Sequence, residues 1–163
     1  MAISTVAKNF RDGSVSITDG AGLTMDLNYT AGDFNISGLI EGQKEVAKYL
    51  NRGDFFSARK TNQVFASFSF TAILTDVADG TNKTLQDAFL KSGAWASAVS
   101  SLGTNEEVYT LNLVWTIEGT DHGDPTDHTV SMSHCRCSDL SMTEGDPDMI
   151  NISGEILGAV TLA

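Results

Sequence analysis

The sequence has few cysteines, few basic residues and no long apolar run. Its two cysteines, Cys135 and Cys137, are one residue apart. This spacing closes no useful loop, so we expect two reduced thiols and no disulfide. No stretch reaches the roughly 20 apolar residues needed to cross a bilayer, and residues 1–10 lack the apolar core of a signal peptide. We therefore expect no membrane partner and maturation in the cytoplasm where the chain is made.

The shortage of basic residues is confined to one part of the chain. Of 10 Lys and Arg and 21 Asp and Glu, seven of each lie in residues 1–70, so the whole net charge of −11 comes from residues 71–163. Because Lys and Arg supply most of the affinity for DNA by displacing phosphate counterions, we expect no tight binding of nucleic acid. The acidic surface is instead suited to repelling DNA.

Motifs for catalysis and nucleotide binding are also missing. The chain has no Gly-x-Ser-x-Gly elbow, no phosphate-binding Gly-x-x-x-x-Gly-Lys and no His-Glu-x-x-His. Three histidines and two cysteines fall within sixteen residues: His122, His128, His134, Cys135 and Cys137. On a strand, however, the two cysteines point to one face and His134 points to the other, so these residues do not converge on zinc without a bulge. We expect no enzyme, no metal and no cofactor.

Apolar residues that alternate with small polar residues are abundant. In residues 64–75, Phe68 and Phe70 alternate with Ser67 and Ser69, which predicts a strand with one apolar and one hydroxylic face. Residues 108–118 show the same alternation. Residues 22–38 are typical of strand, turn and strand, and further strands are expected at 129–137 and 149–162, separated by a turn at 144–148.

One helix and one arm complete the predicted elements. At about 82–92, Thr84 can cap a short helix, and Gly93 can take the left-handed closing position. Residues 44–60 suit either a short helix or an exposed edge, and we favour an extended arm. With no repeat or linker, the prediction is a single mainly β domain over 1–163, a two-sheet β-sandwich or barrel with one short flanking helix and this arm.

Several stretches of the sequence resemble a known family. They are Arg52-Gly53-Asp54 leading into Arg59-Lys60, the strand 66–76, the helix 85–91 followed by glycine, and 141–158 with Glu144-Gly145-Asp146-Pro147. In these stretches and in the order of its elements, the chain resembles the tail tube (major tail) proteins of long-tailed bacteriophages. That family is related to the inner tube proteins of contractile tails and secretion systems.

This resemblance implies a structural virion protein whose β-sandwich subunits close into six-membered rings. The rings stack into a tail tube that encloses the tape-measure protein and later conducts double-stranded DNA without binding it tightly. The implied partners are other copies of the chain, the tape-measure protein, the tail terminator and distal tail or baseplate proteins, and the implied location is the virion tail, assembled in the bacterial cytoplasm. Two alternatives stay open, an inner tube of a contractile tail or secretion system and a monomeric sandwich that binds carbohydrate or metal.

Residues for the channel and for subunit contacts follow from strand parity and charge. The channel lining is expected from polar residues opposite the apolar faces of their strands: Ser67, Ser69, Thr71, Thr110, Asn112, Thr116, Asn151, Ser153 and Glu155. Contacts between subunits or rings are expected to join basic and acidic residues: Lys44, Lys48, Arg52, Arg59 and Lys60 with Asp121, Asp124, Asp127, Glu144, Asp146 and Asp148.

Overall fold

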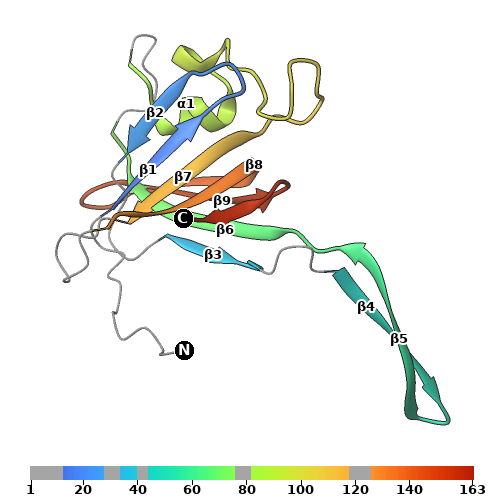
Figure 1. Ribbon diagram of the computed structural model, residues 1–163. Coiled ribbons are helices and arrows are strands. Elements are labelled where there is room, and N and C mark those ends of the chain that lie inside the picture. Colours follow the sequence, from blue (N-terminus) through green and yellow to red (C-terminus); the bar gives the residue numbers. More distant parts are fainter. Residues whose placement is uncertain (1–12, 28–33, 40–43, 76–81, 118–125) are drawn as a thin grey trace.

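A computed structural model of the chain describes residues 13–27, 34–39, 44–75, 82–117 and 126–163. It contains an eight-stranded sheet, in which seven strands follow the order β2-β1-β7-β8-β9-β6-β3 and β10 pairs with β8, and a separate two-stranded sheet of β4 and β5 (Figure 1). The strands are β1 (Gly13–Thr18), β2 (Thr24–Leu27), β3 (Asn35–Ser37), β4 (Lys44–Asn51), β5 (Asp54–Gln63), β6 (Ala66–Ile73), β7 (Leu111–Ile117), β8 (His128–Thr143), β9 (Met149–Ile156) and β10 (Val160–Leu162). The predicted mainly β fold is confirmed.

The long strand β8 divides the large sheet into two halves. From His128 to Cys135 it pairs with β7, and from Cys135 to Thr143 it pairs with β9. A register shift and the positive φ of His134 (56°) mark the place where β8 passes from one partner to the other. We call β2, β1, β7 and the start of β8 the first half-sheet, and β3, β6, β9 and the end of β8 the second half-sheet.

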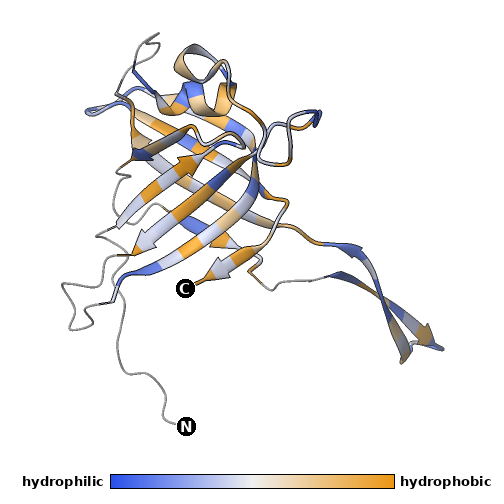
Figure 2. Ribbon diagram, turned by 45° about the horizontal axis from the view of Figure 1, so that its top comes forward, coloured by the Kyte–Doolittle hydropathy of each residue, from blue (hydrophilic) through white to orange (hydrophobic). Residues whose placement is uncertain are grey.

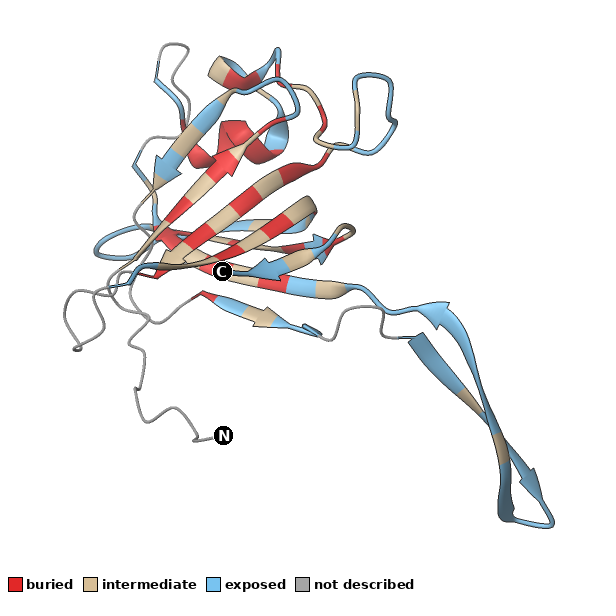
Figure 3. Cartoon of the chain, viewed as in Figure 1, coloured by how far each residue is buried: buried red, intermediate tan, exposed pale blue. Residues whose placement is uncertain are grey.

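The hydrophobic core lies between the two half-sheets. Along β7 the buried Leu111, Leu113 and Trp115 alternate with half-buried residues, and buried residues also alternate along β1, β6 and β9 (Figure 3). Apolar and polar residues alternate along the strands of the body in the same way (Figure 2). Phe34, which precedes β3, stacks on Phe70 at 5.4 Å and on Trp115 of β7 at 4.6 Å between ring centroids. Aromatic contacts therefore bridge the two halves, as a β-sandwich requires.

The predicted helix is present as α1 (Leu85–Leu90), and a 3₁₀ turn, η1 (Gly93–Trp95), follows it. Thr84 caps the helix by accepting a hydrogen bond from the Asp87 amide at 3.3 Å, while its hydroxyl donates to the Asp87 carboxylate at 2.6 Å. The left-handed closing residue is Lys91 (φ 54°), so the prediction of Gly93 for this position is wrong. A Cβ at Gly93 would meet the Asp87 carboxylate at 2.5 Å, which explains why glycine stands there.

The predicted arm is a β-hairpin that projects from the body (Figure 1). β4 and β5 pair antiparallel as far as Asn51 and Asp54, with two register shifts along the way, and a two-residue turn of Arg52 and Gly53 joins them. Both turn residues have positive φ (52° and 93°), the conformation that suits the twist of a two-residue hairpin. Almost the whole arm is exposed (Figure 3).

Several strands differ from the sequence prediction. β1 was not predicted, although Val15 and Ile17 are fully buried. The strands predicted within 22–38 are present, but β2 pairs with β1 and β3 pairs with β6, so they do not face each other. The segment 149–162 contains two strands, interrupted at 157–159, where the amides of Leu157 and Gly158 donate to the carbonyls of His134 and Ser133 in β8. No helix among the described residues is long and apolar enough to span a membrane.

Candidate functional site

The outer face of the second half-sheet is lined by small polar side chains. The strand registers align Ser37 of β3 with Ser67 of β6, Ser67 with Glu155 of β9, and Glu155 with Arg136 of β8. The next row on this face aligns Asn35, Ser69, Ser153 and Asp139 in the same order. We call this surface the polar wall.

Hydrogen bonds link the polar wall across its strands. The hydroxyls of Ser37 and Ser67 are 2.7 Å apart, and the Thr71 hydroxyl donates to the Asn151 side-chain oxygen at 2.9 Å. A hollow of about 320 Å³ on this surface is lined mainly by serines: Ser37, Ser67, Ser69, Ser138 and Ser153. The wall is thus uncharged over much of its area and offers hydroxyl groups to water.

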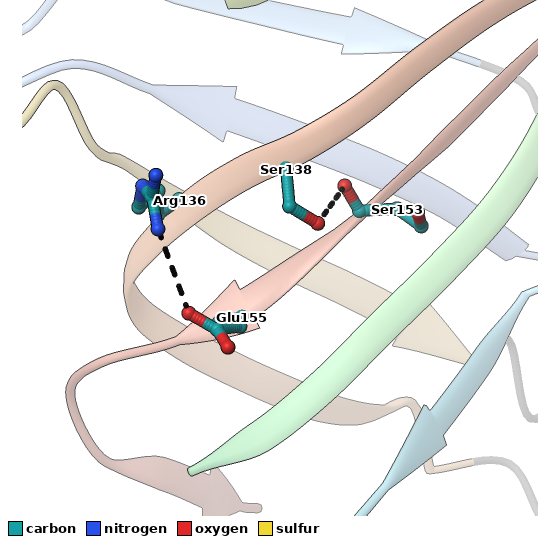
Figure 4. Close-up of polar contacts among 4 residues, drawn as sticks. All are labelled: Arg136, Ser138, Ser153 and Glu155. Atoms are coloured by element: carbon teal, nitrogen blue, oxygen red, sulfur yellow. Dashed lines mark hydrogen bonds and ion pairs between the residues drawn. The ribbon is translucent and has the colours of Figure 1, made fainter.

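A bulge in β8 shapes one side of the polar wall. The register shifts between Cys137 and Asp139, so Ser138 is the extra residue and its hydroxyl donates to the Ser153 carbonyl at 3.3 Å (Figure 4). The shift reverses the parity of the strand, because Leu140 then aligns with buried Ile152 instead of facing outward. Periodicity alone could not place the residues after the bulge correctly.

The structure brings six of the nine predicted channel residues together on this wall: Ser67, Ser69, Thr71, Asn151, Ser153 and Glu155. Asn112 and Thr116 lie on β7, on the outer face of the first half-sheet across the core. One channel cannot be lined by both outer faces of a sandwich. Asn112 and Thr116 therefore cannot line the same channel as the residues of the polar wall.

Thr110 does not face outward at all. It precedes β7, is buried, and its hydroxyl lies 3.0 Å from that of Ser100 and 2.9 Å from that of Ser101. Its prediction as a channel residue is wrong because a local hydroxyl network, rather than solvent, satisfies the side chain.

The second half-sheet has open edges. Among the described residues, β7 follows β8 only as far as Cys135, so residues 138–143 of β8 have no strand on the side away from β9. At the other end, β3 is the last strand of the described sheet. Unpaired strand edges are templates for pairing with another chain.

The arm carries both basic and apolar exposed side chains. The predicted contact residues Lys44, Lys48, Arg52, Arg59 and Lys60 are all exposed. Near the tip, Phe55 is 67% exposed and Phe56 is 72% exposed, with exposed Leu50 beside them. We call Leu50, Phe55 and Phe56 the apolar tip. These residues were not among the predicted contact residues, although three large apolar residues beside the Arg52-Gly53 turn are a signal for an exposed contact.

The predicted acidic contact residues lie elsewhere on the molecule. Glu144, Asp146 and Asp148 are exposed in the turn between β8 and β9, where the Asp148 carboxylate accepts from the Gly145 amide at 2.8 Å. This turn lies on the side of the body opposite the arm (Figure 1). Asp127 is exposed just before β8, and Asp121 and Asp124 lie outside the described residues.

The cysteines and His134 are separated. Burial raises the pKa of Cys135 to about 12 and also raises the pKa of Cys137, so both are expected as neutral thiols at neutral pH. His134 instead lies with its Nδ1 atom 3.1 Å from the Ser101 hydroxyl. Within the described ranges, no group of three or more His, Cys, Asp or Glu side chains is arranged to hold a metal ion.

No protein-family model and no curated protein sequence matches the chain. Solved structures do match it. A chain of the sheath–tube complex of the extracellular contractile injection system PVC in its extended state has a TM-score of 0.58 and 13% identity, with 99% of both chains covered. A chain of the anti-feeding prophage baseplate has a TM-score of 0.56 and 14% identity, covering 100% of this chain and 97% of that one.

A chain of the PVC sheath/tube terminator complex matches equally well, with a TM-score of 0.58, 14% identity and 99% coverage of both chains. The chain shares their fold. A chain of the anti-feeding prophage cap complex also matches, with a TM-score of 0.55 and 12% identity, covering 100% of this chain and 94% of that one. These similarities show a fold shared with chains of injection-system and prophage particles, and none of the four structures is described as a long-tailed phage.

Proposed function

We propose that the chain is a structural subunit that closes into six-membered rings, and that these rings stack into the tube of a phage-like tail or contractile injection particle. The polar wall carries this proposal, because a continuous hydroxyl-rich face on a four-stranded half-sheet suits the lining of a wet channel. The fold shared with tube–sheath, terminator and baseplate complexes supports it.

Ring closure is proposed to occur at the open edges of the second half-sheet. The β8 edge of one subunit, residues 138–143, pairs with the β3 edge of the next, so that the half-sheets join into one barrel. Each subunit then contributes one β8 edge and one β3 edge, a head-to-tail contact that closes when the rotation per subunit divides the circle.

A disulfide cross-link between these edges tests ring closure. Within one subunit, β8 and β3 are separated by β9 and β6, so three strand spacings of about 4.8 Å place them about 14 Å apart. A disulfide needs Cα atoms within about 7 Å, so Ser141→Cys combined with Asn35→Cys can only cross-link neighbouring subunits. Because the register between subunits is not fixed, Thr143→Cys and Ser37→Cys serve as neighbouring alternatives.

The expected result is a ladder of covalent oligomers that ends at six, formed under mild oxidation in a Cys137→Ser background. Each single-cysteine variant is the matched control and should give no species beyond a dimer. If the protein forms tubes in the microscope but no pair gives a ladder, the proposed edge contact is wrong. If size-exclusion chromatography shows only monomers at high concentration, the result supports the alternative function, a monomeric binding module.

Ring stacking is proposed to use the arm. The basic arm and the acidic β8–β9 turn lie on opposite sides of the body, so opposite charges of successive rings can meet (Figure 1). Single exposed ion pairs contribute only about 0–1 kcal/mol, but a ring repeats each pair in every subunit. Reversal of Lys48 and Arg52 to Glu should leave the subunit folded and shorten or abolish tubes, and salt should weaken the wild-type assembly in the same direction.

The same stacking experiment has a clear negative outcome. If the double reversal forms tubes of normal length at every salt concentration, the arm makes no electrostatic contact between rings.

We propose a non-enzymatic role for the chain. Its further partners are proposed as a tape-measure protein, a terminator and baseplate or distal tail proteins, with DNA or another cargo in transit through the channel. The structural similarity favours a contractile system over a long-tailed phage.

A further inference from the structure

Among the described strands of the polar wall, one basic side chain is present. The sequences of β3, β6 and β9, together with β8, contain one Lys or Arg, which is Arg136. Its guanidinium Nη1 lies 3.7 Å from the Glu155 Oε2 atom, and Figure 4 shows the two side chains directed toward each other from neighbouring strands. Arg136 and Glu155 are register partners, so the backbone pairing itself keeps them adjacent.

This ion pair contributes little to the stability of the fold. The side chains are 52% and 50% exposed, and pairs of this kind are worth about 0–1 kcal/mol. Its effect on a charged molecule passing the wall is larger, because an unpaired guanidinium binds phosphate by releasing counterions. A carboxylate beside the guanidinium cancels the positive charge for any ligand whose distance exceeds the separation of the two charges.

The adjacent row adds a second carboxylate to the wall. Asp139 aligns with Ser153, beside the pair of Glu155 and Arg136. These three are the charged side chains of the polar wall among the described residues, so its balance is one negative charge per subunit. Without Glu155 the balance would be neutral, and a cation would be free to bind phosphate.

We propose, on the basis of the proposed channel, that Glu155 is the counter-charge that prevents Arg136 from holding a polyanion on the channel wall. The residue thereby determines whether double-stranded DNA is retained: with Glu155 in place, DNA moves along the wall instead of being held there. Closure into a ring repeats the pair in every subunit, so a single substitution converts a neutral row into a ring of unpaired guanidinium groups.

The test measures binding of a short fluorescent DNA duplex to the full chain by anisotropy, as a function of salt. Glu155→Gln is compared with Glu106→Gln, which removes the same charge from an exposed residue in the loop before β7. Glu155→Gln should bind about tenfold more tightly at low salt, with a log–log salt slope steeper by about 0.9 for each added phosphate contact. Glu106→Gln should bind DNA like the wild type, because Glu106 lies away from the polar wall. Nonspecific DNA binding by the basic arm is the same in every sample.

The double variant Arg136→Gln, Glu155→Gln should lose the gain, because the cation that Glu155 masks is then absent. Equal binding by Glu155→Gln and Glu106→Gln overturns the inference, and so does a gain that persists in the double variant. Ser69→Lys places an unpaired cation on the same wall without touching the pair, and it should reproduce the gain if Glu155→Gln does not fold. A lack of gain in Ser69→Lys likewise overturns the inference.

Electron microscopy of the same samples separates this inference from the proposed function. If the wild type forms no rings or tubes, the proposed function fails whatever the DNA titration shows. If tubes form and Glu155→Gln tubes bind DNA no better than wild-type tubes, only the role of Glu155 is wrong.

Discussion

The replacement of Asp19 by alanine should destabilise the first half-sheet strongly. Asp19 is buried just after β1, and its carboxylate connects two segments that are far apart in the sequence. One oxygen accepts from the Ala21 amide at 2.9 Å and from the Leu23 amide at 2.7 Å, while the other accepts from the Val99 amide at 2.9 Å. The side chain therefore shapes the β1–β2 turn and ties it to the loop after η1.

The cost of the substitution follows from these three bonds. Each buried donor left without its acceptor costs about 1–3 kcal/mol, but Ala21 is exposed and water can replace its partner. We expect Asp19→Ala to lower the free energy of unfolding by about 2–4 kcal/mol in total. Asp26→Ala is the matched control, because Asp26 is an exposed carboxylate on the neighbouring strand, and it should change stability by less than about 0.5 kcal/mol.

The effect should also depend on pH with a definite sign. Burial raises the pKa of Asp19. The hydrogen bonds from the amides of Val99, Leu23, Ala21 and Gly22 together lower the pKa by more than burial raises it, so the pKa lies below its usual 3.8. A lowered pKa in the folded state adds stability above the unfolded pKa, and this stability is lost as the pH falls through the folded pKa. Asp19→Ala should remove that part of the acid sensitivity.

Urea unfolding at neutral pH and at a series of acidic pH values measures both quantities. Equal stability of Asp19→Ala and the Asp26→Ala control at neutral pH would show that the three hydrogen bonds do not stabilise the fold. A parallel loss of stability of the wild type and Asp19→Ala on acidification would show that the Asp19 carboxylate contributes nothing specific to the pH dependence.

Three further predictions concern the arm, a thiol and a close contact. Phe55→Ser with Phe56→Ser should leave subunit stability within about 0.5 kcal/mol, because both rings are exposed, and should abolish tubes in the microscope; tubes of normal length would show that the apolar tip makes no contact. Cys135, with its pKa raised to about 12, should resist alkylation at pH 8 until the protein unfolds, and rapid modification would contradict its burial. Gly154→Ala should cost more than about 2 kcal/mol in urea unfolding, because a Cβ there would collide with the Arg136 carbonyl oxygen, and wild-type stability would show that the strands move apart easily.

Alternation was sufficient to predict the strands that carry the polar wall. In β6 the apolar positions Phe68 and Phe70 are buried and the hydroxyl positions Ser67 and Ser69 face outward, as their parity predicts. This works because β6 has no bulge and one of its faces is fully covered by the core. The helix was also predictable, because Thr84 is a typical capping residue at its start. For residues 44–60 the sequence suited either a short helix or an exposed edge, and the favoured extended arm is present as the hairpin of β4 and β5.

What the sequence did not predict depends on contacts between distant segments. Thr110 has the parity of an outward residue, but hydroxyls of Ser100 and Ser101 enclose it. The bulge at Ser138 reverses the faces of the following residues, and no local signal marks it. The division of the polar residues of β6 and β7 between two outer faces likewise follows from the sheet order, which periodicity does not contain.

A cryo-electron microscopy reconstruction of the assembled protein tests the central claim most directly, because it shows which face of the subunit lines the channel. We expect stacked six-fold rings in which Ser67, Ser69 and Ser153 point toward the axis, and in which the β8 edge of each subunit pairs with the β3 edge of the next. A map in which this face points outward, or in which Phe68 and Trp115 face the lumen, would contradict it.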